Sequence, residues 1–465
     1  MTYESTATTV SIDLLKKYDR PGPRYTSYPT VPVWSNTVGA SDYRQALANA
    51  SRRQDEPFAI YCHIPFCKRR CYYCGCNTVI TNSQRRVEDY IRALMNEVEN
   101  TAAMMGQRRR ISQLHFGGGT PNYLDCQGIA QLLRHMDKFF EFVPNAEKSM
   151  EIDPRVTTVQ QLEFLAAAGF NRISMGVQDF DLLVQEACGR VQPLELVENL
   201  LSHCRRLEFT GINFDLIYGL PKQTVEGFSK TIDAAIALRP DRLAVYSFAY
   251  LPSSLAHQSK ILPEDLPTTG VKYRLFATAV EKFTAAGYRQ IGMDHFALPE
   301  DELTRAQADG RLFRNFMGYT VQHSPEMVGF GMSSIGYIDN AFFQNHSKLD
   351  SYQNAIAENQ FATYRGLRLN DDDLLRQYLI TQLMCNFRLN YEDLAAKFGV
   401  AYNDYFGTEH KQLGVFFDDD LLREDAAGLT ITPVGRTFVR NIAMTYDAYL
   451  NGSQADKTPT FSRTI

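Results

Sequence analysis

The sequence lacks any run of about 18 apolar residues, the length that a membrane-spanning helix needs, and its opening stretch MTYESTATTVSIDLLKKYDRPGPRYTSYPT has no apolar signal core. It also lacks a strong charge of either sign. The net charge of its 465 residues is −5, which gives no electrostatic reason to expect a nucleic-acid partner. No repeat or low-complexity tract interrupts it. We therefore expect a cytoplasmic globular protein that neither inserts into membranes nor binds nucleic acid.

Strand and helix patterns alternate from about Phe58 onward. The six strand candidates are FAIYCHIPF, ISQLHFGG, KSMEIDP, RISMGVQD, INFDLIYGL and RLAVYSFAYLP. Such alternation implies parallel strands joined by helical crossovers. Six units are too few for an eight-fold barrel, so the pattern predicts an α/β fold with a partial (βα)6 TIM-like barrel, open along one side. In such sheets the chemistry gathers at the carboxyl ends of the strands.

The two ends of the chain have a different character from its middle. Residues 1–55 are rich in Pro, Tyr and Ser and are predicted to form an N-terminal arm that covers the active site. Residues 56–365 would form the barrel and its extension, and residues 366–465 a mainly helical C-terminal domain. There NDDDLLRQYLITQLMCNF places three Asp at a helix start, where they suit the helix dipole, and GLTITPVGRTFVRNI indicates a short β-ribbon followed by a helix.

Four of the nine cysteines crowd into one stretch, HIPFCKRRCYYCGCN, directly after the first strand candidate. Cys67, Cys71 and Cys74 have the spacing C-x3-C-x2-C, and thiolates suit zinc or iron–sulfur centres. Structural zinc commonly takes two separated ligand pairs, and no second C-x2-C or H-x3-H pair follows. A [4Fe–4S] cluster ordinarily takes four cysteines, so three would leave one iron open to an exogenous ligand.

The basic residues Lys68, Arg69 and Arg70 between these cysteines have three interpretations. They could depress the thiol pKa values and ease reduction of a cluster, they could be an ordinary solvated loop, or they could form a docking point for an acidic electron donor.

Polar residues stand at the ends of several strand candidates. Three glycines (117–119) and Thr120 end the second, and successive glycines let a backbone approach a ligand closely. Glu151, Gln178 and Asp215 end later strands, and Arg190 could pair with a carboxylate. Each alone could serve an internal hydrogen bond, but their gathering at one rim favours a shared function.

The cysteine spacing after a first barrel strand resembles the signature of the radical S-adenosylmethionine (SAM) superfamily. The segments GPRYTSYPT, YCHIPFCKRRCYYCGCN, GGGTP, EIDPR, RISMGVQDF, DLIYGLPKQT, IGMDHFA, NFMGYT and CNFRL are similar, in order and over nearly the whole chain, to the oxygen-independent coproporphyrinogen III oxidase family. This resemblance implies oxidative decarboxylation of two propionate side chains of coproporphyrinogen III to vinyl groups, giving protoporphyrinogen IX in anaerobic haem biosynthesis.

The resemblance also implies cofactors, partners and residue roles. The cofactors would be a [4Fe–4S] cluster and two SAM molecules, the partner a reduced flavodoxin- or ferredoxin-type donor, and the chain a monomer. Cys76 would be a catalytic cysteine that does not bind the cluster. The family's positions map onto Cys67, Cys71 and Cys74 for the cluster, onto Tyr61, Gly118, Glu151 and Ile335 for the first SAM, and onto Tyr73, Gly119, Thr120, Gln178, Arg190, Asp215 and Ala249 for the second. Tyr73 departs from the phenylalanine more usual there.

The substrate has four propionates, so we hypothesise that Arg24, Tyr25 and Tyr28 of the arm fold over the barrel mouth and contact it; simple packing of the arm is the alternative. Three competing functions remain: a paralogous haem-binding protein without the oxidase activity, a radical SAM methyltransferase of anaerobic haem breakdown, and a zinc-stabilised interaction module.

Overall fold

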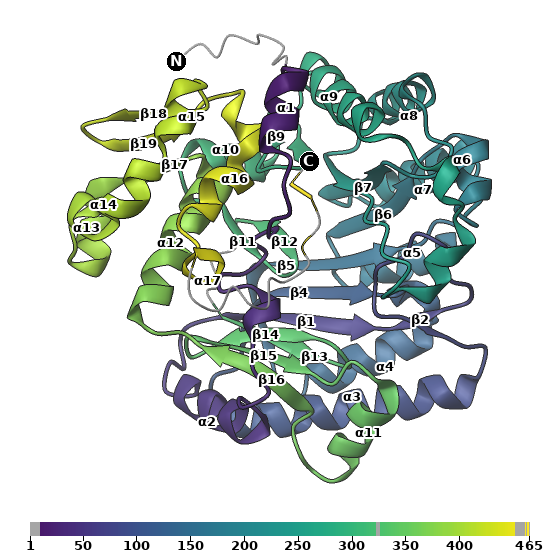
Figure 1. Cartoon of the computed structure of the whole chain (residues 1–465). Coiled ribbons are helices and arrows are strands. Elements are labelled where there is room, and N and C mark those ends of the chain that lie inside the picture. The colour runs from purple at the N-terminus through teal and green to yellow at the C-terminus, as the bar shows by residue number, and fades with distance from the viewer. Residues whose placement is uncertain (1–9, 322–325, 452–460, 462, 465) are drawn as a thin grey trace.

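Six parallel strands form the centre of the computed structural model, which describes residues 10–321, 326–451, 461, 463 and 464. They are β1 (Phe58–Ile64), β4 (Arg110–Gly118), β5 (Glu141–Ile152), β6 (Arg172–Gln178), β7 (Gly211–Tyr218) and β8 (Arg242–Ser247), hydrogen-bonded in this order. Their connections carry α3 (Gln84–Met105), α4 (Cys126–Met136), α5 (Val159–Ala167), α6 (Leu182–Ala187), α7 (Leu194–Arg206) and α8 (Val225–Leu238), and α9 (Thr269–Ala285) follows β8 (Figure 1). The predicted partial (βα)6 barrel is confirmed, and all six predicted strands are present.

Six further strands extend this sheet beyond what the sequence predicted. β13 (Met327–Phe330) pairs parallel with β1, and β14 (Ile335–Ile338), β15 (Ala341–Asn345) and β16 (Thr363–Arg368) follow as antiparallel neighbours. At the other edge β10 (His295–Ala297) and β9 (Arg289–Ile291) pair antiparallel beyond β8. The barrel edges at β1 and β8 are thereby hydrogen-bonded rather than open.

Smaller elements surround the sheet. They are α2 (Ala40–Ala50), β2 (Phe66–Cys67), β3 (Val79–Ile80), α10 (Glu302–Ala308), β11 (Phe313–Asn315), β12 (Gly318–Thr320) and α11 (Leu349–Ala357), with the 3-10 helices η1 (Val31–Val33), η2 (Pro121–Tyr123), η3 (Ala256–Lys260), η4 (Pro263–Asp265) and η5 (Gly435–Phe438).

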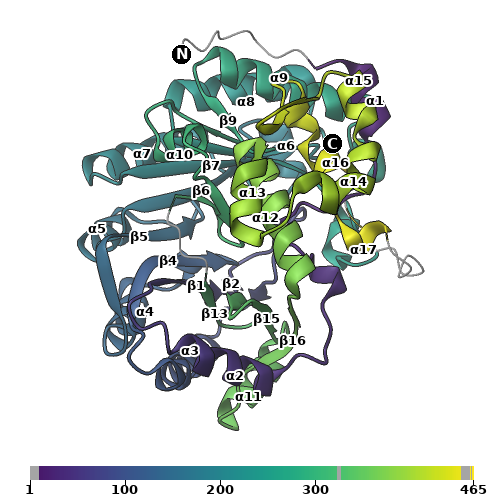
Figure 2. The same cartoon turned by 90° about the vertical axis from the view of Figure 1, so that its left-hand side faces the viewer.

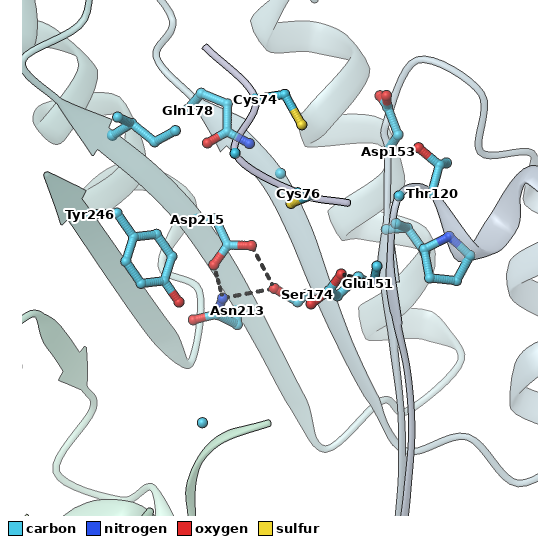
Figure 3. Close-up of a pocket in the computed structure, with 18 of the residues that line it drawn as sticks. Cys74, Cys76, Thr120, Glu151, Asp153, Ser174, Gln178, Asn213, Asp215 and Tyr246 are labelled. Carbon is cyan, nitrogen blue, oxygen red and sulfur yellow. Dashed lines mark hydrogen bonds between the residues drawn. The ribbon is translucent and has the colours of Figure 1, made fainter. Parts of the chain in front are cut away.

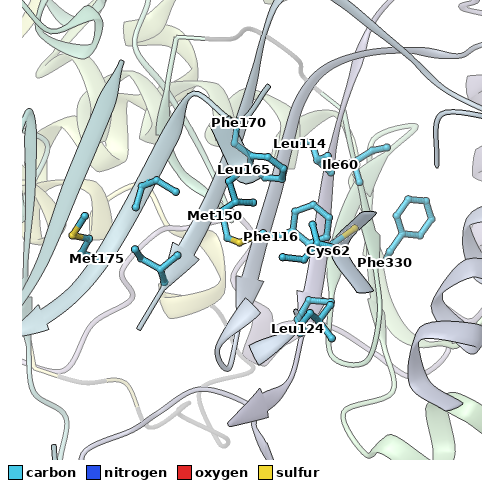
Figure 4. Close-up of a cluster of buried hydrophobic side chains, with 14 of the residues drawn as sticks. Ile60, Cys62, Leu114, Phe116, Leu124, Met150, Leu165, Phe170, Met175 and Phe330 are labelled. Carbon is cyan, nitrogen blue, oxygen red and sulfur yellow. The ribbon is translucent and has the colours of Figure 1, made fainter. Parts of the chain in front are cut away.

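The main core lies between the outer face of the barrel and its helices (Figure 4). Alternate residues of each strand point outward, so Leu114 and Phe116 of β4 and Met150 of β5 pack against Leu165 of α5 and its neighbours. Burial of each such side chain stabilises the fold by roughly 1.5–3 kcal/mol. α5 begins as predicted, at a capping box in which Thr158 and Gln161 bond each other's backbone amides.

The arm and the C-terminal residues share a second core. It combines Leu15 and Tyr18 of α1 (Ile12–Tyr18) with Leu379, Phe438 and other C-terminal side chains. Figure 2 shows this part as a helical layer beside the barrel. Its elements are α12 (Asp371–Asn386), β17 (Arg388–Asn390), α13 (Tyr391–Phe398), α14 (Tyr402–Gln412), α15 (Gly414–Asp418), β18 (Leu422–Asp425), β19 (Gly428–Ile431), α16 (Val439–Met444) and α17 (Ala448–Asn451).

Both secondary-structure predictions for this part are confirmed. α12 starts at the three aspartates, where Asn370 and Asp373 form a capping box, and the ribbon β18–β19 precedes α16. The division of the chain at residues 55 and 365 stays a prediction. In the described ranges no helix combines the length and the apolar character required to cross a bilayer.

Candidate active site

A cavity of about 610 Å³ occupies the inside of the partial barrel (Figure 3). It runs from the cysteine loop and Gln178 at the carboxyl ends of the strands to Arg172 and Arg242 at their amino ends. Thirteen of the predicted site residues line it: Cys67, Cys71, Tyr73, Cys74, Cys76, Gly118, Gly119, Thr120, Glu151, Gln178, Arg190, Asp215 and Ala249.

The inner wall of the barrel is polar. Inward positions alternate with the buried apolar ones, so that Gln113 and His115 of β4 face the cavity while Leu114 and Phe116 face the helices. Other cavity-lining residues that sequence reasoning missed are Glu147, Ser149, Asp153, Arg155, Arg172, Ser174, Asn213, Arg242, Tyr246 and His295. Polar residues repeating every second position on successive strands were the available signal, because a packed barrel interior would be mostly branched apolar side chains.

The cysteine loop is held in place by contacts from other loops. The backbone amide of Tyr72 donates to the Cys188 carbonyl over 2.9 Å, and His257 Nε2 lies 2.7 Å from the Cys74 carbonyl oxygen. Gln258, which is buried, donates to the carbonyls of both Tyr73 and Ala249. The loops after β1 and β8 are therefore fastened to each other across the cavity.

Each thiol of the C-x3-C-x2-C triplet has a polar neighbour. Cys67 Sγ lies 3.2 Å from the Thr120 hydroxyl, and Arg155 and Arg190 each donate to Cys71 Sγ over 3.6 Å. The neighbouring Cys76, helped by Arg70 and Arg190, lowers the pKa of Cys74 to about 7. Burial instead raises the pKa of Cys67 to about 11. The charge of Arg70, within the basic part of the loop, thus contributes to lowering the pKa of a cysteine thiol.

The three thiols and the cationic groups that donate to them suit the ligand set of an iron–sulfur cluster. Within residues 10–321 and 326–451 no group of three or more His, Cys, Asp or Glu side chains is arranged to hold one metal ion. A cluster distributes its thiolates over separate irons, and hydrogen bonds to the sulfurs tune its potential. The bonds from Arg155 and Arg190 to Cys71 are of this kind.

The glycine stretch and Arg190 fit a ligand beside the cysteines. A Cβ on Gly119 would lie 2.5 Å from the Pro65 carbonyl oxygen, so only glycine lets this strand end approach the cysteine loop. Gly118 has φ +120°, which L-residues rarely adopt, and its amide donates to Glu151 over 3.1 Å. Arg190 Nε is buried without a partner among the described residues, as expected of a donor reserved for an acidic ligand.

Two carboxylates in the cavity differ in their preferred charge. Burial raises the pKa of Glu151, but the hydrogen bond and charge of His115 and the Gly118 amide outweigh it, so that the net pKa is below the ordinary value. Burial and the neighbouring charge of Glu151 raise the pKa of Asp215 to about 7. Asp215 accepts hydrogen bonds of 3.0 and 2.9 Å from Ser174 and Asn213 (Figure 3). The cavity therefore offers one ionised acid and one that holds its proton near neutrality.

An ion-pair network stands behind Cys71. Asp153 Oδ2 accepts from Arg155 over 2.6 Å and from Arg190 over 3.0 Å, and both guanidinium groups reach the same sulfur. These bonds outweigh the desolvation of Asp153 and lower its pKa. The network adds net positive charge next to one predicted cluster ligand.

Tyr61 on β1 and Ile335 on β14 lie outside the cavity lining, with β13 between their two strands. The Tyr61 hydroxyl lies 3.0 Å from His63 Nδ1, and its ring stacks on His115. Gly329 is in register with Tyr61, and a Cβ there would touch the Ile335 carbonyl oxygen at 2.5 Å. The two residues thus flank the same edge of the site.

The three arm residues also lie outside the cavity lining. Tyr25 donates to Asp447 over 2.9 Å, and the Tyr28 hydroxyl accepts from the Ala448 amide. Arg24 pairs with Asp294 and stands 5.6 Å from the ring centroid of Tyr246, which does line the cavity. This placement agrees with packing of the arm, and contact with substrate stays a prediction.

The chain matches two family models and several known proteins. Residues 61–235 match the model of the radical SAM superfamily, and residues 369–438 that of the HemN C-terminal domain. The oxygen-independent coproporphyrinogen III oxidases of Pseudomonas aeruginosa and Escherichia coli K12 are each 42% identical to the chain, over 97% of its length and 98% of theirs. The solved structure of coproporphyrinogen III oxidase (HemN) from E. coli, described as a radical SAM enzyme, superimposes with a TM-score of 0.91 at 41% identity, covering 96% of this chain and all of that one.

Proposed function

The chain belongs to the oxygen-independent coproporphyrinogen III oxidase family, and from that membership we propose that it oxidatively decarboxylates two propionates of coproporphyrinogen III to vinyl groups, giving protoporphyrinogen IX. It is an enzyme of the radical SAM superfamily, whose members use a [4Fe–4S] cluster and SAM. The single observation that carries the proposal is the placement of three cysteines around one end of a polar cavity, in a chain related over 97% of its length to named oxidases.

Cys67, Cys71 and Cys74 would hold the cluster, with Thr120, Arg155 and Arg190 donating to the sulfurs. The bound cluster and SAM supply the one-electron chemistry that removes a hydrogen atom from the substrate propionate. The chain itself supplies position and shelter from water.

We propose the predicted division of labour at the SAM sites. Glu151, ionised and fixed by the Gly118 amide, would accept hydrogen bonds from a ribose, with Tyr61 and Ile335 along the same edge. Tyr73, Gly119, Thr120, Gln178, Arg190, Asp215 and Ala249 would contact a second SAM. Supporting this, the buried Nε of Arg190 needs an acceptor, and Gln258 joins the carbonyls of Tyr73 and Ala249 into one wall.

Cys76 is proposed to act in catalysis rather than as a ligand. Its side chain lines the cavity, and the neighbouring Cys74 together with burial raises the pKa of Cys76, which favours the neutral thiol. A protonated thiol at this place can donate a hydrogen bond to the reacting group.

Further parts of the proposal are a cytoplasmic location, a monomeric state and a reduced flavodoxin- or ferredoxin-type donor. All nine cysteines are free of disulfides, as a reducing compartment requires.

The deciding experiment is anaerobic purification and reconstitution, followed by incubation with coproporphyrinogen III, SAM and a reductant. We expect about four irons per chain for a [4Fe–4S] centre, vinyl products and release of methionine. Cys67→Ala should lose both iron and turnover, whereas Cys126→Ala, a substitution away from the cavity, should keep both. Haem binding without vinyl formation would favour the paralogous haem-binding protein, and methyl transfer would favour the methyltransferase.

A further inference from the structure

Exposed apolar side chains gather on one face of the molecule. Seven of the ten large apolar residues that are exposed in the described part of the chain lie on connections after the parallel strands, around the carboxyl-terminal rim. They are 36–66% exposed: Ile80, Val159, Leu182, Leu183, Val191, Leu251 and Leu262. Apolar residues scattered singly need no explanation, but a concentration beside a predicted redox centre does.

Exposed cations surround the cysteine loop on the same rim. They are Lys68, Arg69 and Arg70 within the loop, Arg85 and Arg86 at the start of α3, and Lys260 in η3. In the described part of the chain none of the six forms an ion pair with a carboxylate. The chain as a whole carries −5, so this positive surface runs against its overall charge. Exposed carboxylates also lie on these connections, among them Glu88, Glu186, Glu195 and Glu264.

Contacts between three connections bring these groups together around the loop. Lys260 Nζ stands 4.9 Å from the ring centroid of Tyr72, and the Tyr72 amide donates to Cys188 at the end of α6. Cys67 pairs with Ile80 in the β2–β3 ladder, and Ile80 lies four residues before the start of α3. The connection after β1, the α6–α7 connection and the connection after β8 therefore meet at the cysteine loop. We call Lys68, Arg69, Arg70, Arg85, Arg86, Lys260, Leu182, Leu183 and Val191 the rim patch.

We propose that the rim patch is the docking surface for a small acidic protein that carries one electron. The inference rests on the proposed function, because a cluster that must be reduced needs a donor close to its ligands. One electron passes from the reduced carrier to the cluster; the carrier is oxidised by one electron, the cluster reduced by one, and no bond forms or breaks. Cations beside exposed apolar side chains match an acidic partner in charge, and such complementarity raises the rate of encounter. An anionic membrane surface is the competing occupant.

The test separates the carrier from a small reductant. Cluster reduction is followed by anaerobic stopped-flow absorbance with a bacterial flavodoxin hydroquinone as probe and with dithionite as comparison. The variant R85Q/R86Q/K260Q removes cations remote from the thiolates, and L182S/L183S removes the apolar pair. The control R52Q/K138Q/K411Q removes three exposed cations elsewhere that form no ion pair within the described part of the chain, so it changes the net charge equally.

We expect R85Q/R86Q/K260Q to slow reduction by flavodoxin about tenfold or more at low ionic strength. Added salt should slow the wild-type reaction and have little effect on this variant. L182S/L183S should weaken binding of oxidised flavodoxin while keeping the salt dependence. Dithionite should reduce all four proteins at one rate, and the control should match wild type.

Equal rates for R85Q/R86Q/K260Q and the control would overturn the docking surface. The docking surface would also be overturned if the wild type and all variants bound phosphatidylserine vesicles and none of them bound flavodoxin. If dithionite-reduced protein converts no coproporphyrinogen III while flavodoxin still binds with the expected salt and variant pattern, the proposed function fails and the docking surface stands.

Discussion

Substituting Gly119 by Ala tests the claim that a bare backbone at this strand end lets the cysteine loop close over the cavity. A Cβ there would lie 2.5 Å from the carbonyl oxygen and 2.7 Å from the carbonyl carbon of Pro65, and 3.1 Å from Cys67 Sγ. Both of the closest atoms are backbone atoms of β1's continuation into the loop, and the Gly119 amide itself donates to the Ile64 carbonyl over 2.9 Å. Neither of these two backbone segments can move aside without breaking the hydrogen bond between Gly119 and Ile64.

The expected cost of G119A is about 1–3 kcal/mol, the usual range for overpacking, with the displacement falling on Cys67. We expect a lower unfolding temperature for the cluster-free chain and reduced iron after reconstitution, measured by calorimetry and by iron and sulfide analysis. Gly75 is the matched control, because it lies in the cysteine loop and a Cβ there would meet no atom within 4 Å. If G119A takes up iron and unfolds like G75A, the close approach at Gly119 has no role in forming the site.

Three further predictions concern charge. Arg155→Gln should make the midpoint potential of the cluster more negative than Arg155→Lys does, in an EPR-monitored titration, because the latter keeps a cation near Cys71; equal potentials would contradict this. Asp215 has a pKa of about 7 when folded against 3.8 ordinarily, so the folded state retains a proton that the unfolded state has lost. Its contribution to stability is therefore full below about pH 4 and is lost towards pH 7, by at most about 1.4 kcal/mol per pH unit. The unfolding free energy of wild type should fall relative to D215N over that window, and parallel curves would refute the shift. Glu326→Ala leaves the fully buried Arg108 without its carboxylate and should cost about 3–5 kcal/mol in chemical unfolding, while Glu226→Ala, at an exposed pair, should change nothing measurable.

The barrel could be predicted from the sequence because its strands carry the information locally. Each of the six is a run of β-branched and aromatic residues after a helix with its own capping signals, such as Thr158 and Gln161 before α5. The edge strands β9, β10 and β13–β16 could not be found in this way. They are three to six residues long, and their pairing with β1 and β8 joins segments far apart in the chain. Their formation depends on the exposed edges that the barrel presents, which is a tertiary cause.

The predicted cysteine ligands are equally local in the sequence, whereas the contacts around them are not. Arg155 and Arg190 contact Cys71, and Gln258 contacts Tyr73, over separations of 84 to 185 positions in the sequence. Gln258 also contacts Ala249, nine positions away. No spacing rule connects these residues. The arm shows the limit of residue type as a guide. Tyr25 and Tyr28 are aromatic residues suited to covering a substrate, and their hydroxyls bond Asp447 and Ala448; their contact with the substrate stays a prediction.

The amino-terminal end of the barrel explains how the protein tolerates a polar interior. Arg172 Nε bonds Glu147 over 2.8 Å, and Arg242 bonds Asp301 over 2.9 Å and Glu302 over 3.1 Å, so that cations and carboxylates neutralise each other below the cavity. An unpaired charge there would be costly to bury, whereas a network that pairs both guanidinium groups with carboxylates closes the end of the barrel without filling it with apolar side chains. The inner positions nearer the cysteines are consequently free to carry Glu151, Asp215 and Asn213 towards a ligand, and the stability of the barrel depends on its outer, helix-covered face.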